Sequence, residues 1–292
     1  MTRSPHPPTD GTPRARAPNI CLNLSGSAEN VLLVRETLTG LAEALGLDGG
    51  DLNDIRTAVT EACNNVVLHA YEGEEGALEV EIYALRDAID VVVRDHGSGI
   101  RPRIPGVHNG ASGIGVPVIQ ALAQSVEFSS VEDEGTEVQM RFATPQAVAL
   151  EAIPAEAPEL PEVVQTELAR TMGIVIAPMS LACEILPRLL CLLAARAQFS
   201  TDRISDAQLL ADALVAQTPA SIEGIRVGVG VSVQPRKLEL HVGPLRTGRA
   251  IWRLVDSTVA GLSPVVEKLV NQLGVVPVGS SEALSLQLSD QR

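Results

Sequence analysis

One predicted helix, residues 51–71, constrains the fold of this chain more than any other segment. Its apolar residues fall three and four positions apart, which is the spacing of a helix that buries one face. They are Ile55, Val59, Ala62, Cys63, Val66 and Val67. Glu61 and Asn65 lie one turn apart, so their side chains share a face beside this apolar stripe. The helix therefore places a carboxylate that can accept a proton next to an amide oxygen that can bind a hard cation.

Two short glycine-containing motifs follow this helix. Residues 94–99 read RDHGSG and end a predicted strand, and residues 112–115 read SGIG and open a predicted helix. Free N–H groups at the start of a helix can hold phosphate oxygens. With the polar pair on the first helix, and in this order along the chain, the motifs indicate an ATP site.

The order of strands and helices in residues 19–143 predicts an α+β fold. Helices come early and late around antiparallel strands, which is typical of a two-layer α/β sandwich. We expect a mixed, mainly antiparallel sheet with helices on one face, and residues 21–24 as an edge strand. The other predicted strands are 78–85, 89–95, 125–130 and 136–142, and the helices are 28–45, 51–71 and 113–124.

The second half of the chain repeats this order of elements, which predicts a tandem duplication. A shorter helix is expected to open at Ser205, in the place of helix 51–71. Pairing the two helices by pattern sets Asp206 on Asp54, Ala213 on Glu61 and Gln217 on Asn65. Pro219 is expected to break the second helix, and the strand at 238–244 offers no acid in the place of Asp95. The second copy is therefore expected to lack the ligand-binding residues.

Composition divides the chain into four segments. Residues 1–18 are expected to form a disordered tail, and residues 19–146 the ATP-binding domain. Residues 147–167 contain three prolines and five glutamates with no Lys or Arg, the composition of a linker. Residues 168–292 form the degenerate second copy.

Charge and cysteine content exclude some classes of protein. The net charge of −14 argues against nonspecific nucleic-acid binding, which requires clustered Lys and Arg. The four cysteines show no CxxC pair and no metal-ligand spacing, which favours a reducing cytoplasm. Residues 1–19 lack the apolar core of a signal peptide or membrane span. We expect a cytoplasmic protein that binds neither nucleic acid nor membrane.

The motifs of residues 22–142 resemble those of the GHKL ATP-binding superfamily, which has the Bergerat fold. Within this superfamily they are most similar to those of the bacterial anti-sigma-factor serine kinases. The EACNN of residues 61–65 and the HAY of residues 69–71 are similar to the N-box of that subfamily. Residues 95–99 and 112–115 are similar to the next two boxes, and Gly135-Thr136 completes the set. Each motif alone is common, but four in the right order are specific.

The resemblance implies a role for each polar residue. Glu61 is expected to act as the general base that takes a proton from an attacking hydroxyl. Asn65 is expected to supply an oxygen to Mg²⁺. Asp95 is expected to accept a hydrogen bond from the exocyclic amine of adenine, and Thr136 to lie at the same end of the nucleotide.

The glycines and the loop between the motifs are given roles by the same resemblance. Gly97 and Gly99 are expected to allow a tight turn beside the nucleotide. The phosphates are expected at the next motif, formed by Ser112, Gly113 and Gly115. Arg101 and Arg103 either meet the γ-phosphate or a partner, or are solvated charges.

Three further residues of these motifs are expected to be structural. His69 falls at the end of the helix, where a capping or packing role is expected, although it is also a candidate base. Tyr71 is expected to pack, and His96 to fill the turn.

The function implied is an ATP- and Mg²⁺-dependent protein serine kinase. Proteins of this kind hold a sigma factor and phosphorylate a small antagonist, the anti-anti-sigma protein. The second copy would mimic the partner of a kinase pair within one chain, although a homodimer is also open. The alternatives are a regulatory module that binds ATP without phosphotransfer and, less favoured, a histidine-kinase-like ATPase domain. The latter requires a phosphoacceptor helix pair, which residues 1–19 are too short and proline-rich to provide.

Overall fold

The structure is a computed structural model that describes residues 16–71, 74–97, 115–131, 135–144, 150, 153, 172–217, 221–248, 266 and 268–290. The disordered tail predicted for residues 1–18 and the linker predicted for residues 147–167 lie almost wholly outside these residues. The loop that carries Arg101 and Arg103 lies outside them entirely.

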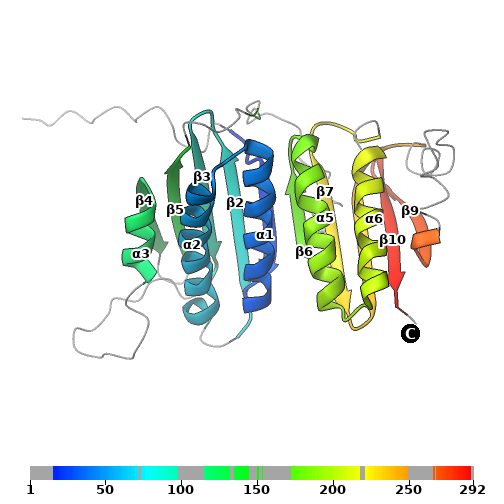
Figure 1. Ribbon diagram of the computed structural model, residues 1–292, viewed down its shortest axis with the longest axis horizontal. Helices are drawn as coiled ribbons and strands as arrows, with labels where there is room; N and C mark the ends of the chain where they lie inside the picture. The colour runs from blue at the N-terminus through cyan, green and yellow to red at the C-terminus, as the bar shows by residue number, and fades with distance from the viewer. Residues whose placement is uncertain are drawn as a thin grey trace, which may run out of the picture.

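In the described residues, ten strands form one sheet, and the helices cover one of its faces (Figure 1). The strand order is β4-β5-β3-β2-β1-β6-β7-β8-β10-β9, and each neighbouring pair is antiparallel. This confirms the predicted α+β sandwich. The first five strands are β1 (Ile20–Ser25), β2 (Ala77–Ala84), β3 (Ala88–Asp95), β4 (Ser125–Val131) and β5 (Gly135–Ala143). The others are β6 (Met172–Ile176), β7 (Val227–Gln234), β8 (Lys237–Arg246), β9 (Gln272–Val278) and β10 (Ser281–Ser289).

The helices follow the sequence pattern closely in the first half. They are α1 (Ala28–Leu45), α2 (Gly49–Asn65), the π-helix η2 (Val66–Ala70) and α3 (Gly115–Leu122), followed in the second half by α5 (Met179–Arg196) and α6 (Thr201–Gln217). α2 begins earlier than predicted because Asp48 caps it: its carboxylate accepts hydrogen bonds from the amides of Gly50 and Asp51, at 2.8 and 2.9 Å.

The prediction that residues 21–24 form an edge strand is wrong. β1 lies in the middle of the sheet, where it pairs with β2 on one side and with β6 on the other. Its register with β6 sets Ile20 opposite Ile176 and Asn23 opposite Gly173. The sequence of a strand specifies which face is buried, but a distant segment decides whether both of its edges are paired.

α1 and α5 lie side by side at the centre of the molecule (Figure 1). Gly40 of α1 allows a close approach, since a Cβ there would lie 2.8 Å from the carbonyl oxygen of Glu184. Ion pairs flank this contact: Arg196 with Glu29 at 2.6 Å, and Arg188 with Glu43. Helix packing and strand pairing therefore both join the two halves.

The second half repeats the pairing pattern of the first. Outward from the centre the pairs are β1–β2, β2–β3, β3–β5 and β5–β4 in one half, and β6–β7, β7–β8, β8–β10 and β10–β9 in the other. The predicted start of a helix at Ser205 is wrong, because α6 begins at Thr201; the described part of α6 is 17 residues long, the length of α2 without η2. The alignment that sets Asp206 on Asp54 also sets both ends of α6 on those of α2. A duplication as the origin of this pattern stays a prediction.

The core lies between the sheet and the helices and is aliphatic. One cluster of buried residues runs through both halves. Its largest fully buried side chains include Ile20, Leu22, Leu38 and Ile174. Among the described residues, no helix is both long and apolar enough to cross a membrane.

Candidate functional site

The polar pair of the sequence lies where α2 ends. Glu61 and Asn65 are both half-buried, while Ala62 and Cys63 between them are in the core. Asn65 is the last residue of α2, and the chain continues as the π-helix η2 rather than in the predicted regular helix. Single π-turns of this kind are frequent at functional sites.

The first residue of α3 lies directly beside this pair. A Cβ built on Gly115 would lie 3.1 Å from Glu61 Oε2 and 3.6 Å from Asn65 Oδ1. The lack of a side chain at Gly115 thus allows the start of α3 to lie close to both side chains. Two segments some fifty residues apart in the sequence therefore meet at one place: the end of α2 and the start of α3.

Asp95 is at the end of β3 on the helix-covered side of the sheet. It has the same parity along the strand as the core residues Val91 and Val93, and it is only 6% exposed. Its Oδ1 accepts a hydrogen bond from the amide of Gly97 at 2.9 Å. Thr136 stands opposite Asp95 in the register of β3 with β5 and is half-buried. The two residues expected at the adenine end are therefore neighbours.

The turn after Asp95 is enclosed by backbone on two sides. A Cβ on Gly97 would lie 2.1 Å from the carbonyl oxygen of Ala70, at the end of η2. Gly135, the first residue of β5, has φ +96 and lies against the backbone of Asp95. An ideal Cβ on Gly135 would lie 2.0 Å from the Asp95 carbonyl oxygen. No side chain fits at either position without moving the backbone.

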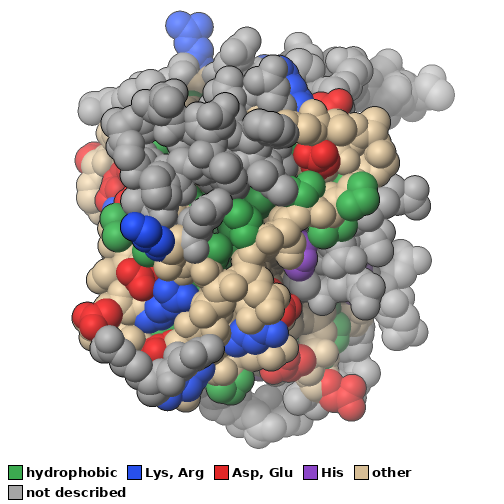
Figure 2. Space-filling view, turned by 90° about the vertical axis from the view of Figure 1, so that its right-hand side faces the viewer, with side chains coloured by type: hydrophobic (Ala, Val, Ile, Leu, Met, Phe, Trp, Pro, Cys, Tyr) green, Lys and Arg blue, Asp and Glu red, His purple; other side chains and the backbone are tan. Residues whose placement is uncertain are grey.

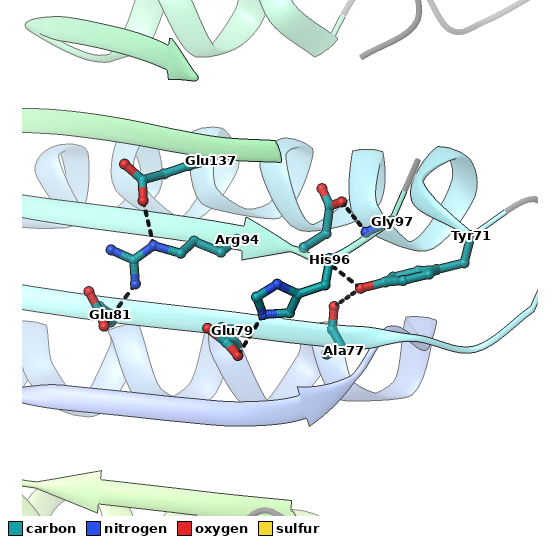
Figure 3. Close-up of polar contacts among 9 residues, drawn as sticks. Tyr71, Ala77, Glu79, Glu81, Arg94, His96, Gly97 and Glu137 are labelled. Carbon is teal, nitrogen blue, oxygen red and sulfur yellow. Dashed lines mark hydrogen bonds and ion pairs between the residues drawn. The ribbon is translucent and has the colours of Figure 1, made fainter. Parts of the chain in front are cut away.

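A charged cluster on the other face of the sheet fixes the strands just before Asp95 (Figure 3). Arg94 pairs with Glu81 of β2 at 2.8 Å and with Glu137 of β5. Partial burial alone would lower the pKa of Arg94, but the hydrogen bonds to both carboxylates outweigh it and raise the pKa. The guanidinium therefore stays charged and ties three neighbouring strands together.

The structure thus brings together six of the predicted site residues in two adjoining groups. Glu61, Asn65 and Gly115 form the first group, and Asp95, Gly97 and Thr136 the second. The contact of Gly97 with Ala70, five residues after Asn65, joins them. Gly99, Ser112 and Gly113 lie outside the described residues. Within the part of the chain that the structure describes, no three His, Cys, Asp or Glu side chains are grouped to hold a metal ion.

Tyr71, predicted to be a packing residue, also makes two hydrogen bonds that the sequence did not predict. Its hydroxyl accepts a hydrogen bond from the amide of His96 at 2.9 Å and donates one to the carbonyl oxygen of Ala77 at 2.6 Å (Figure 3). His96, taken as a filler of the turn, has its Nε2 2.9 Å from Glu79 Oε1. The position of Tyr71 at the end of the N-box-like segment was the signal available.

At the matching helix of the second half, an alanine stands at the position of Glu61. Ala213, the counterpart of Glu61, is 1% exposed, and its neighbours Leu214 and Val215 are also buried. The described part of α6 thus contributes apolar residues to the core where α2 presents a carboxylate.

Residues 24–142 match the family described as histidine kinase-like ATPase domain. The serine-protein kinase RsbW of Bacillus cereus (strain Q1) is 28% identical over 137 residues, which cover 43% of this chain and 84% of the relative. RsbW of Bacillus mycoides (strain KBAB4) is 28% identical over 131 residues, covering 41% and 81%. A solved histidine kinase domain, from a blue-light activated kinase of Erythrobacter litoralis EL346, is 19% identical over 34% of this chain and 48% of that chain, with a TM-score of 0.30.

The family match and the RsbW relatives confirm the resemblance that the motifs indicated for the first half, and they do not extend it to a second copy. Residues 24–142 of this chain therefore form a histidine kinase-like ATPase domain, with serine-protein kinases among its relatives.

Proposed function

We propose that this chain is an ATP- and Mg²⁺-dependent protein serine kinase that regulates transcription in the cytoplasm. In this proposal it binds a sigma factor and phosphorylates a small anti-anti-sigma-type protein. The observation that carries the proposal is the position of Gly115 against Glu61 and Asn65. It puts a helix start, a carboxylate and an amide oxygen around one space. The names of the relatives, serine-protein kinases at 28% identity, support it.

The adenine end of the nucleotide is assigned to Asp95 and Thr136. The Asp95 carboxylate uses Oδ1 to hold the Gly97 amide, and a carboxylate has further acceptor sites for an exocyclic amine. The Thr136 hydroxyl, its neighbour across the strands, can donate or accept beside it. Because Asp95 is nearly buried, an unpaired acceptor there would be costly, which favours adenine over a base lacking that amine.

The triphosphate end is assigned to the start of α3 and to the polar pair. Backbone N–H groups at Gly115 suit phosphate oxygens, since they lack partners within the helix. Asn65 Oδ1 is the proposed Mg²⁺ ligand: it lies beside the start of α3, 3.6 Å from an ideal Cβ on Gly115, and Mg²⁺ prefers oxygen ligands and retains waters. When bound, the ion neutralises charge on the phosphates.

Glu61 is the proposed general base. It takes the proton from the hydroxyl of a substrate serine as the serine oxygen bonds to the γ-phosphorus and the bond from that phosphorus to the bridging oxygen breaks. The products are phosphoserine and ADP. Its half-buried position leaves Glu61 accessible to such a hydroxyl while α2 holds it in place.

Substitution of Glu61 tests phosphotransfer separately from nucleotide binding. The full chain is titrated with ATP and Mg²⁺ and then assayed for transfer of labelled phosphate to an anti-anti-sigma-type protein of the same organism. We expect Glu61→Gln to bind ATP like the parent and to lose transfer by at least about a hundredfold. Asp54→Asn, the same change at an exposed residue of α2, is the control and should alter neither.

The outcomes separate the candidate functions. ATP binding without transfer by the unaltered chain would favour the regulatory module that only binds ATP. The variants Asn65→Ala and Asp95→Ala should bind ATP more weakly than the parent chain. If both bind it as tightly as the parent does, the pocket is wrongly assigned.

We propose further that the second half takes the place of a partner protomer in an intrachain pseudo-dimer. The supporting observations are that β6 pairs with the edge of β1 and that α5 packs on α1 at Gly40. A second copy of the chain would find both surfaces covered. Sedimentation equilibrium should therefore give the mass of one chain; a stable dimer would favour the homodimer instead.

A further inference from the structure

Tyr71 connects three segments that meet at the adenine end of the proposed site (Figure 3). It follows η2 directly, its hydroxyl donates to the carbonyl of Ala77 at the start of β2, and the same oxygen accepts from the amide of His96 just after β3. Burial raises the pKa of Tyr71, so the hydroxyl keeps the proton that it donates. One oxygen thus fixes the relative positions of a helix end and two strand ends.

The aromatic ring of Tyr71 is held in place by glycine. An ideal Cβ on Gly76 would lie 2.1 to 2.3 Å from three atoms of the ring, so the ring occupies the space that any other residue at that position would fill. The ring also lies near Gly26, whose ideal Cβ would be 3.9 Å from it. The ring thus packs against the backbone of Gly76, and its hydroxyl bonds the amide of His96.

The residue tethered by Tyr71 is the one between Asp95 and Gly97. β3 ends at Asp95, so the His96 amide lies beyond its ladder of strand hydrogen bonds, and Tyr71 provides its acceptor. The His96 side chain is directed to Glu79, two residues after Ala77. The backbone and the side chain of His96 are thus both held near the start of β2. Because Asp95 precedes His96 directly, the orientation of its carboxylate depends on this segment.

We propose that Tyr71 is a positioning residue that aims the Asp95 carboxylate at the exocyclic amine of the purine and so sets the preference for adenine. The inference rests on the proposed function, because it assigns a cause to the nucleotide specificity of the same site. Tyr71 touches neither the phosphates nor the reacting hydroxyl in this scheme. Its loss should therefore affect recognition of the base and leave recognition of the triphosphate intact.

The test compares ATP with purine riboside triphosphate, which lacks the exocyclic amine, by calorimetric titration of the full chain with Mg²⁺. The unaltered chain should prefer ATP. In Tyr71→Phe the preference should fall by about tenfold or more, the loss expected when a hydrogen bond to a charged carboxylate is misaligned, while affinity for the analogue is kept. Asp95→Ala removes the carboxylate itself, so it should lose the preference for ATP completely and serves as the reference for full loss.

The only other tyrosine of the chain provides a matched control. Tyr83 donates its hydroxyl to Glu81 Oε2 at 2.8 Å, away from the turn. Tyr83→Phe also removes one hydroxyl and should keep the preference for ATP unchanged. Loss of the preference in both variants would overturn the inference, because the effect would then not belong to the turn.

Three other results would overturn the inference. The first is a Tyr71→Phe variant with its full preference for ATP, and the second is one that loses affinity for both nucleotides equally. The third requires no variant: fast exchange of the His96 amide in the unaltered chain would show that the tether does not form. A parent chain that binds neither nucleotide would overturn the proposed function itself, and the inference with it.

Discussion

Replacement of Gly40 by alanine measures how tightly the two halves of the chain are joined. In the middle of a helix, Gly→Ala normally stabilises by about 1 kcal/mol through backbone propensity. At Gly40, however, the new Cβ would lie 2.8 Å from the Glu184 carbonyl oxygen and 2.9 Å from Ile185 Cγ1. Apolar carbons normally rest about 3.5 to 4.0 Å apart, so α1 and α5 must separate by several tenths of an ångström or more. Overpacking of this kind costs about 1 to 3 kcal/mol.

Gly49 provides the comparison, because it is also helical and nothing lies within 4 Å of its ideal Cβ. Gly49→Ala should stabilise by about 0.4 to 1 kcal/mol. Gly40→Ala should be less stable than Gly49→Ala by about 1 to 3 kcal/mol, because overpacking against α5 outweighs the difference in helix propensity between the middle of α1 and the first residue of α2. Thermal unfolding followed by far-UV circular dichroism should show this as roughly 2 to 6 °C between the variants. Equal stabilisation of both would refute the close contact of α1 with α5, and with it the support for a pseudo-dimer.

Three further predictions concern single residues. Asp48→Ala should lower the free energy of unfolding by about 1 kcal/mol because α2 loses its cap, whereas Asp48→Asn should keep most of it in the same denaturant titration. Arg141→Met should cost about 2 to 3 kcal/mol because it leaves the carboxylate of Asp90, 2% exposed, without its two hydrogen bonds from Arg141; adding Asp90→Val should recover much of that loss, and no recovery would contradict the pairing. A thiol reagent at pH 8 should modify exposed Cys183 in the folded chain and Cys63 only after unfolding, since burial raises the pKa of Cys63 to about 12; fast modification of Cys63 would show that α2 does not pack as described.

The elements of the first half could be predicted from sequence because their signals are local. The apolar spacing of residues 28–45 gave the bounds of α1 as the structure has them. The place of Glu61 and Asn65 on one helix face needed only the helical period. The strand that ends at Asp95 was recognisable from its β-branched residues and the glycine turn that follows.

The features that sequence reasoning missed depend on partners far away in the chain. β1 looks like an edge strand until residues 172–176 pair with its second edge. The role of Tyr71 depends on His96 and Ala77, which folding brings to its hydroxyl from two different strand ends. The π-turn after Asn65 has no local signal of its own, because residues 66–70 continue the apolar pattern of the helix before it.

The end of α2 differs from the matching position of α6 in a way that bears on where the site is. In the first half, α2 passes into a π-turn at Asn65. Turns of this kind are frequent at functional sites. In α6, the counterpart of α2, Ala213 lies in the core at the position where α2 has the half-buried Glu61. A half-buried carboxylate contributes less to stability than a buried apolar residue, so the two side chains at these matching positions have opposite physical reasons. Under the proposed function, the first half presents a polar side chain here to a ligand, and the second half uses the same position to pack.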